Sequence, residues 1–371
     1  MSVNLFDLNL SQLEKFFTKI GEKPFRARQL MKWVYHAGIL DFDLMTDFGR
    51  ALREKLRAKA HFVLPEIISD KTSLDGTRKW LFRYGCGNSI ETVFIPEDGR
   101  GTLCISSQAG CALDCPFCST GKQGFNRNLS AGEIAVQVWY AKKLLGEFDT
   151  KVQDSRRRSV SNVVLMGMGE PLLNFAAVVT AVDIFLCDYG FGLSKRRVTI
   201  STSGIVPAIE KLRECSEVSL AISLHAPNDE LRNQLVPINA RYGLRELLAA
   251  CQKYIDNNRQ HGGIVWEYVL LAGVNDRPEQ AEELARLLKN IGGKINLIPF
   301  NPYPESPYQK PSKNSVLRFQ RILAENGWTT TIRKTRGDEI DAACGQLVGN
   351  VKNKMRKREE NLNSNKVAVS G

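Results

Sequence analysis

Three cysteines lie within eight residues, Cys111, Cys115 and Cys118, in the run SQAGCALDCPFCSTG. Thiolates at such close spacing are typical ligands of cubane iron–sulfur clusters. Three protein thiolates leave one iron of such a cluster open, and an open iron can bind a small molecule and pass it an electron. A plain electron carrier normally fills that position with a fourth cysteine. The loop therefore predicts chemistry at the cluster rather than electron transfer alone.

A zinc site is the alternative for these three thiols. Zinc prefers four ligands, usually supplied as paired Cys or Cys/His hooks. The next cysteine along the chain is Cys187, and no second hook follows the loop within reach. Nine cysteines spread over 371 residues would rarely produce this spacing by chance. An iron–sulfur cluster is therefore favoured over zinc or inert thiols.

Several polar residues follow segments that read as buried strands. Gly169 and Glu170 end one of these strands. A glycine lets the backbone approach a ligand closely, and the Glu170 carboxylate can accept a hydrogen bond from an ammonium group. Ser201 and Ser223 end two further strands, and their hydroxyls suit ligand hydroxyls. A serine at a strand end is more often a helix cap, however, and a lone histidine such as His225 is usually structural. These residues alone leave the ligand open.

The cysteine spacing, followed by Gly-Glu-Pro, resembles the radical S-adenosylmethionine superfamily. From about Trp80 to Leu347 the chain resembles one branch, the bacterial dual-specificity adenine-C2 methyltransferases of 23S rRNA and tRNA. Besides the cysteine loop, six segments in the family's order carry this resemblance: ETVFIPE at 91–97, VVLMGMGEPLLN at 163–174, RRVTISTSG at 196–204, AISLHAPND at 221–229, INLIPFNP at 295–302 and TRGDEIDAACGQL at 335–347.

The resemblance implies roles that residue types alone leave open. One [4Fe-4S] cluster would be held by Cys111, Cys115 and Cys118. S-adenosylmethionine, two molecules per turnover, would bind at Gly169, Glu170, Ser201, Ser223, Leu224, His225 and Asn301. Taken alone, Cys344 between alanine and glycine would be a small buried residue, but the resemblance makes it the methyl-carrying cysteine. Likewise Cys104 becomes the resolving cysteine and Glu91 the general base.

The mechanism that the resemblance implies avoids polar attack by adenine C2, which is a poor nucleophile. A first S-adenosylmethionine methylates Cys344, for which a thiolate is a good nucleophile. A second binds the open iron, and one electron cleaves it to methionine and a 5′-deoxyadenosyl radical that takes hydrogen from the Cys344 methyl group. The methylene radical adds to adenine C2, and Glu91 removes a proton. Cys104 then attacks the Cys344 sulfur, leaving a transient disulfide and free methylated RNA.

Two other functions remain open from the sequence. Methylation at C8 of the same rRNA adenine, as in antibiotic-resistance relatives, would share the cluster, Cys104 and Cys344. A noncatalytic RNA-binding protein with a structural metal site would suit the cysteine loop and the basic charge. That second reading leaves Cys104, Cys344 and the Gly-Glu-Pro turn unexplained.

The composition fits a globular protein with a polyanionic partner. The net charge is +11, from 51 Lys and Arg against 40 Asp and Glu, and the pI is near 9.2; this suits RNA, although a merely basic protein would show it too. The odd number of cysteines argues against a fully paired secreted framework. We see no signal peptide and no run of about 18 apolar residues. We expect a cytoplasmic protein with no membrane partner.

The elements that would position these residues fall into four regions. Residues 1–75 predict a helical accessory domain, and residues 76–100 a β-hairpin linker with strands at 78–84 and 89–95. Residues 348–371 form a polar, basic tail that reads as frayed. Basic and aromatic residues interleave in the N-terminal domain and suit RNA contact as well as they suit a core helix: Arg26, Arg28, Lys32, Trp33 and Tyr35.

Between them, residues 101–347 alternate strands and helices, which predicts an α/β fold with a parallel sheet covered by helices. The predicted strands are 102–106, 162–167, 197–202, 218–224, 265–271, 294–298 and 329–333. The predicted helices are 130–145, 174–187, 205–214, 243–257, 278–290 and 314–326. The resemblance implies a partial six-stranded β/α barrel, in which function gathers at strand C-termini. It also implies a monomer, a flavodoxin-type electron donor, and RNA substrates that share a stem-loop with a splayed-out adenine.

Overall fold

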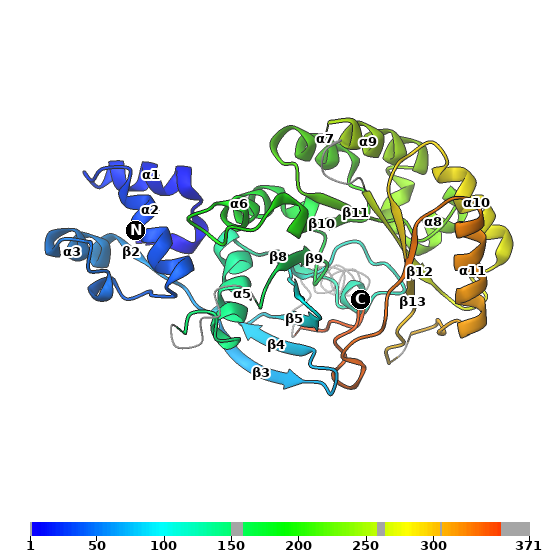
Figure 1. Cartoon of the computed structure of the whole chain (residues 1–371), viewed down its shortest axis with the longest axis horizontal. Helices are drawn as coiled ribbons and strands as arrows, with labels where there is room; N and C mark the ends of the chain where they lie inside the picture. The colour runs from blue at the N-terminus through cyan, green and yellow to red at the C-terminus, as the bar shows by residue number, and fades with distance from the viewer. Residues whose placement is uncertain (1, 150–158, 258–263, 305, 350–371) are drawn as a thin grey trace, which may run out of the picture.

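A single ten-stranded sheet forms the centre of the molecule. The computed structural model describes residues 2–149, 159–257, 264–304 and 306–349. The order across the sheet is β14-β13-β12-β11-β10-β9-β6-β5-β4-β3. Helices lie along the outer side of the strands, and the N-terminal helices lie at one end of the molecule (Figure 1).

The parallel part of the sheet runs from β6 to β14, every neighbouring pair being parallel. Its strands are β6 Arg100–Cys104, β9 Asn162–Leu165, β10 Val198–Thr202, β11 Ser219–Ser223, β12 Ile264–Leu270, β13 Lys294–Pro299 and the short edge strand β14 Thr330–Ile332. β12 is buried along nearly its whole length, as expected for a strand covered on both faces. All seven predicted core strands exist, and the predicted α/β class is confirmed.

Helices connect these strands, as the alternation predicted. They are α5 Ala131–Leu144, α6 Phe175–Leu186, α7 Val206–Cys215, α8 Asp229–Leu235, α9 Leu244–Asn257, α10 Pro278–Leu288 and α11 Lys313–Glu325. The seven-residue α8 was not predicted, because it is too short to show a helical apolar period. Ser130 begins α5 with a capping box, in which its side chain and that of Glu133 satisfy each other's backbone N–H groups.

An antiparallel extension continues the same sheet beyond β6. It consists of β3 Glu66–Thr72, β4 Arg78–Arg83 and β5 Ser89–Glu97. β5 also pairs with β6, so that Val93 lies opposite Cys104. The predicted hairpin of β4 and β5 is present. β3 was not predicted, because its mostly exposed polar residues give no strand signal.

The N-terminal helices are docked against α5 and α6. They are α1 Leu10–Lys19, α2 Arg26–Met31, continued by a π-helical turn Lys32–His36, and α3 Arg50–Lys59, with β1 Val3–Asn4 paired to β2 Ala60–His61. Phe6 packs edge-on against Trp139 of α5. The Trp139 Nε1–H donates to the Val34 carbonyl at 2.9 Å, and Asn9 donates to Asp183 of α6. The N-terminal helices are thus fixed to the core by apolar and polar contacts together.

The basic-aromatic segment divides between core and surface. Tyr35 is 2% exposed and belongs to the core, whereas Trp33 donates to Asp47 at 2.6 Å. The charged groups of Arg28 and Lys32 lie over the ring of Tyr189 in the loop after α6. Tyr35 thus belongs to the core, as a core helix requires, while Arg28 and Lys32 lie outward against Tyr189; their contact with RNA stays a prediction.

In the described ranges no helix has the length and apolarity needed to cross a bilayer. Of the predicted basic tail, residues 350–371 lie outside the described residues.

Candidate active site

One large cavity opens at the carboxyl ends of the parallel strands. It encloses about 1040 Å³ of empty space, its open mouth included. Ten of the residues singled out from the sequence line it: Cys111, Cys115, Cys118, Gly169, Glu170, Ser201, Ser223, His225, Asn301 and Cys344. Parallel strands bring their carboxyl ends to one edge of a sheet, so residues far apart in sequence meet there.

The cysteine loop is held between two short strands. β7 Gln108–Gly110 pairs antiparallel with β8 Phe125–Asn128, and the four-residue helix α4 Ser119–Lys122 follows Cys118. Burial raises the pKa of the Cys111 thiol to about 12. It also raises the pKa of Cys115 and Cys118, and Cys118 adds to the effect on Cys115. Bare thiolates would be costly here, so the anionic form needs a cationic partner.

These thiols fit an iron–sulfur cluster in their donor chemistry, their number and their common cavity. In the part of the chain that the structure describes, no group of three or more His, Cys, Asp or Glu side chains is arranged to hold a single metal ion. A cluster sets a different requirement, because each thiolate binds its own iron. The loop backbone packs closely against Gly121: a β-carbon at that position would lie only 3.1 Å from the backbone nitrogen and oxygen of Cys115.

The turn after β9 places a buried carboxylate at the cavity wall. Backbone N–H groups of Leu172 and Ser203 donate to the two oxygens of Glu170 at 3.0 and 2.8 Å. Burial nevertheless raises the pKa of Glu170, while these donors lower it. No Lys or Arg forms an ion pair with it among the described residues. A carboxylate so placed can accept a ligand's ammonium group.

The next strand ends supply hydroxyl, imidazole and amide groups. His225 has φ +61° and accepts a hydrogen bond at Nδ1 from the Val269 N–H at 3.0 Å. Burial lowers the pKa of His225 to about 3, so its ring is neutral. Asn301 accepts a hydrogen bond from Thr335 at 3.0 Å. Leu224 does not line the cavity. Its N–H donates to the Glu267 carbonyl, and its carbonyl accepts a hydrogen bond from the Arg232 side chain.

The segment carrying Cys344 crosses the cavity and is tied to the cysteine loop. The Ser119 N–H donates to the Gly345 carbonyl, and the Thr120 hydroxyl to the Leu347 carbonyl, both at 2.8 Å. Cys344 therefore forms part of the same wall as Cys118. The structure thus joins two cysteine motifs whose proximity the sequence could not show.

Cys104, at the end of β6, lies behind this wall. It is 6% exposed and is not a lining residue of the large cavity. Burial first, and then the nearby Cys344, raise the pKa of the Cys104 thiol to about 12, whereas Arg333 lowers it. The two sulfurs therefore lie within each other's electrostatic reach.

Glu91 of β5 also lies outside the cavity lining. Its carboxylate forms an ion pair with Lys79 at 2.9 Å and accepts a hydrogen bond from the Val348 N–H at 2.9 Å. Burial raises its pKa, and Lys79 opposes that effect. Through Val348, Glu91 is connected to the segment that carries Cys344.

Two charged residues at the site were not predicted. Glu267 lines the cavity at 5% exposure and accepts from Asn296 at 2.8 Å. Arg333, just after β14, is half-buried, with Nη1 4.0 Å from the Met166 sulfur. A single acid in the apolar run IVWEYVL was a usable signal for Glu267, because buried strands rarely carry an unpaired charge.

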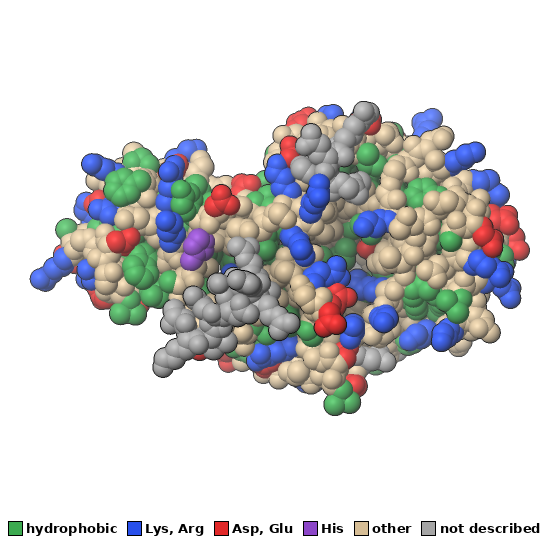
Figure 2. All heavy atoms as spheres, in the orientation of Figure 1, with side chains coloured by type: hydrophobic (Ala, Val, Ile, Leu, Met, Phe, Trp, Pro, Cys, Tyr) green, Lys and Arg blue, Asp and Glu red, His purple; other side chains and the backbone are tan. Residues whose placement is uncertain are grey.

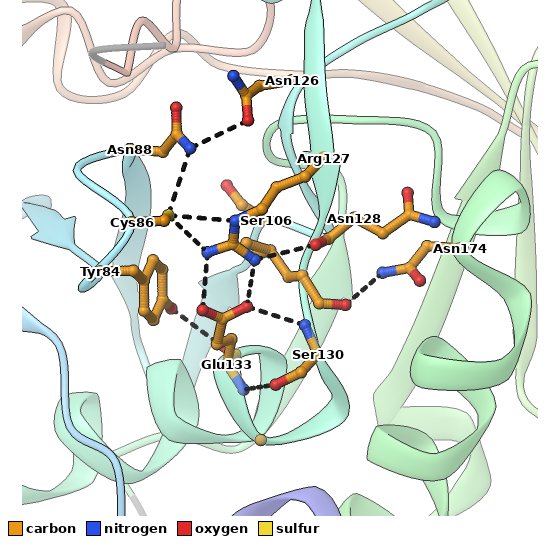
Figure 3. A network of polar contacts seen from close by, with 12 residues as sticks. Tyr84, Cys86, Asn88, Ser106, Asn126, Arg127, Asn128, Ser130, Glu133 and Asn174 are labelled. Carbon is orange, nitrogen blue, oxygen red and sulfur yellow. Dashed lines mark hydrogen bonds and ion pairs between the residues drawn. The ribbon is translucent and has the colours of Figure 1, made fainter. Parts of the chain in front are cut away.

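A polar network fixes β8 against its neighbours (Figure 3). Arg127 forms a bidentate pair with Glu133 at 2.6 and 2.7 Å and donates to the Cys86 sulfur at 3.2 and 3.1 Å. Asn174 Nδ2 donates to the carbonyls of Ser107 and Leu129 at 2.9 and 2.8 Å. The strands on both sides of the cysteine loop are therefore anchored to α5 and to the turn before α6.

Comparisons with known proteins agree with this architecture. The model of the ribosomal RNA large subunit methyltransferase N-terminal domain matches residues 3–62, and that of the radical SAM superfamily matches residues 105–288. The dual-specificity RNA methyltransferase RlmN of Dichelobacter nodosus is 61% identical over 358 residues, 96% of this chain and 97% of that protein. The protein of that name from Pseudomonas putida is 56% identical over 96% of this chain and 93% of its own length.

A solved structure shares the fold. The radical SAM methyltransferase from Sphaerobacter thermophilus superposes with a TM-score of 0.85 at 43% identity, covering 93% of this chain and 99% of that one. The predicted radical SAM fold is thereby confirmed.

Proposed function

The chain belongs to the RlmN family of dual-specificity RNA methyltransferases within the radical SAM superfamily, and we propose that it methylates C2 of adenine in 23S rRNA and in tRNA. The observation that carries this proposal is the wall shared by Cys344 and the cysteine loop. A noncatalytic metal-containing protein would have no use for a cysteine there. Membership of a methyltransferase family also disfavours that alternative.

Cys111, Cys115 and Cys118 would hold one [4Fe-4S] cluster, and family membership implies both an iron–sulfur cluster and S-adenosylmethionine. When bound, the cluster would supply the electron that cleaves S-adenosylmethionine and so provides a 5′-deoxyadenosyl radical. Glu170 would receive the ammonium group of this ligand, because its buried carboxylate has no cationic partner among the described residues. The other proposed contacts are Gly169, Ser201, Ser223, Leu224, His225 and Asn301.

Two sulfurs of the chain would carry the methyl group and release the product. Cys344 would accept a methyl group as a thiolate and later hold the RNA covalently, since it lies on the cavity wall. Cys104 would attack the Cys344 sulfur and form a disulfide; the electron pair of the broken sulfur–carbon bond passes to the methylene carbon, which takes up a proton to become the RNA methyl group. The unpaired electron left on the adduct by the radical addition would first return to the cluster. Glu91, held next to the Cys344 segment by Val348, would act as the general base. Two molecules of S-adenosylmethionine would be used per turnover.

Further parts of the proposal concern the setting of the reaction. A single-electron donor of flavodoxin type would reduce the cluster, and the protein would act as a monomer. An oxygen-sensitive cluster needs a reducing compartment, so we place the enzyme in the cytoplasm. A shared stem-loop with an accessible adenine would explain how one site serves two RNAs.

Nucleoside mass spectrometry tests the regiochemistry. A 23S rRNA fragment and a tRNA would be treated anaerobically with cluster-reconstituted protein, S-adenosylmethionine and reductant, then digested and compared with 2- and 8-methyladenosine standards. We expect 2-methyladenosine in both RNAs. 8-Methyladenosine would instead assign the chain to the alternative reaction, and unmodified RNA from protein with an intact cluster would refute methyltransferase activity.

A further inference from the structure

A second, smaller pocket lies on the other side of Cys344. It holds about 290 Å³ of empty space, its open mouth included, and shares Cys344, Asn301 and Ile298 with the large cavity. Three cations line it, Arg333, Lys334 and Arg336, and no Asp or Glu is among its described lining residues. We call it the basic pocket.

The cations of the basic pocket are poorly neutralised within the described chain. Arg333 and Lys334 form no ion pair with a carboxylate there, and Arg333 is nevertheless half-buried. Arg336 lies 3.7 Å from Asp75, and both side chains are about one-third exposed, so this pair is weak and leaves guanidinium donors unused. Burial alone would lower the pKa of Arg333, but Glu267 and Glu97 raise it without forming an ion pair with Arg333 among the described residues, so the pocket keeps donors that an anion from outside can occupy.

The segment that carries these cations is held in place. The Asp75 carboxylate accepts from the Gly337 N–H at 3.2 Å, and Glu339 accepts from the Ser73 hydroxyl at 2.9 Å. Both contacts clamp residues 337–339 to the turn between β3 and β4. The backbone that carries the cations is therefore fixed, which reduces the entropic cost of binding an anion.

We propose that the basic pocket binds a phosphodiester of the substrate RNA next to the target adenine. Guanidinium and ammonium groups with a neighbouring hydroxyl or amide are typical phosphate contacts. Because Cys344 separates the basic pocket from the large cavity, a phosphate held here would direct the adjoining base toward the Cys344 sulfur. Figure 2 shows Lys and Arg side chains gathered around the hollow in the middle of this face, along which a polyanion can approach. The inference rests on the proposed function, because RNA is the ligand.

The test combines a protein change with an RNA change. Lys334→Gln/Arg336→Gln removes two pocket cations, and Arg318→Gln/Arg321→Gln is the control, removing two exposed cations from α11 on the outside of the fold. Binding of an adenine-loop RNA hairpin to anaerobic, cluster-reconstituted protein would be measured by fluorescence anisotropy at several salt concentrations. In matched RNAs, one phosphodiester beside the adenine at a time is replaced by a neutral methylphosphonate.

We expect the pocket variant to bind the hairpin about tenfold more weakly, with a salt slope reduced by roughly 0.7 to 0.9 per lost contact. One methylphosphonate should cost wild-type protein a similar factor and cost the pocket variant nothing further. Equal losses in the pocket and control variants would overturn the inference, as would a methylphosphonate penalty unchanged in the pocket variant. A loss of S-adenosylmethionine affinity with RNA affinity intact would assign the pocket to the cofactor instead. Wild-type protein that shows the coupling but does not methylate RNA would refute only the proposed function.

Discussion

Replacing Gly169 by alanine should damage ligand binding through a defined clash. Gly169 has φ +97°, and a β-carbon there would lie 2.4 Å from Cβ and 2.7 Å from Cγ of Gln108. Gln108 cannot easily move aside, because its Oε1 accepts the Glu170 N–H and its Nε2 donates to Asn128, both at 2.8 Å. The substitution therefore disturbs the turn that orients the Glu170 carboxylate.

The size of the effect follows from two costs. A left-handed backbone costs a non-glycine residue about 1–2 kcal/mol. Displacing Gln108 sacrifices a hydrogen bond worth about 1 kcal/mol. A total of about 2–3 kcal/mol, expressed at the proposed ligand site, would weaken S-adenosylmethionine binding roughly 30- to 150-fold.

Equilibrium dialysis of S-adenosylmethionine against cluster-reconstituted protein measures this directly. Gly146→Ala is the matched control, since Gly146 has φ +76° but nothing lies within 4 Å of the added carbon. It should pay the backbone cost in thermal stability and bind the ligand normally. Binding by Gly169→Ala within about twofold of wild type, or an equal loss of affinity in both variants, would refute the effect of the clash with Gln108.

Two further predictions concern other parts of the fold. Burial alone would raise the pKa of Cys86, but Asn88 and Arg127 donate to its sulfur and lower that pKa. Arg127→Gln should therefore slow the alkylation of Cys86 by iodoacetamide near neutral pH, measured by peptide mass spectrometry with Cys215 as internal reference. An unchanged alkylation rate would contradict the proposed effect of Arg127 on Cys86. Because burial holds the folded pKa of His225 near 3, stability present above pH 6.5 should be lost as the pH falls toward 3. Urea unfolding should show a flatter acid profile for His225→Gln, and parallel profiles would count against a neutral buried ring.

The sequence predicted the core strands well because their signals are local. Apolar runs such as 265–271 carry a strand signal within themselves, and the cysteine spacing is complete within one loop. β3 escaped prediction because no residue of it is fully buried and most of its side chains are polar, so its sequence carries no alternation of apolar and polar residues. Tyr35 was ambiguous because an aromatic residue beside cations suits a core as well as an RNA surface.

The site was predictable only as separate pieces. Nothing in the spacing of Cys104 and Cys344 shows that they share an electrostatic environment, because that depends on β5–β6 pairing and on how residues 333–349 return across the cavity. Arg333 gave no signal, since a cation after a strand is common at surfaces. Its half-burial beside Cys344 is a property of the packed structure.

In the proposed mechanism, Cys344 links S-adenosylmethionine chemistry to RNA and Cys104 breaks that link. The most direct test uses Cys104→Ala protein with S-adenosylmethionine deuterated in its methyl group, followed by protease and nuclease digestion and mass spectrometry. We predict a stable protein–RNA species in which a methylene bridge, having lost one deuterium atom of the original methyl group, joins the Cys344 sulfur to adenine C2. Normal turnover by this variant, or a bridge from a different residue, would contradict the account.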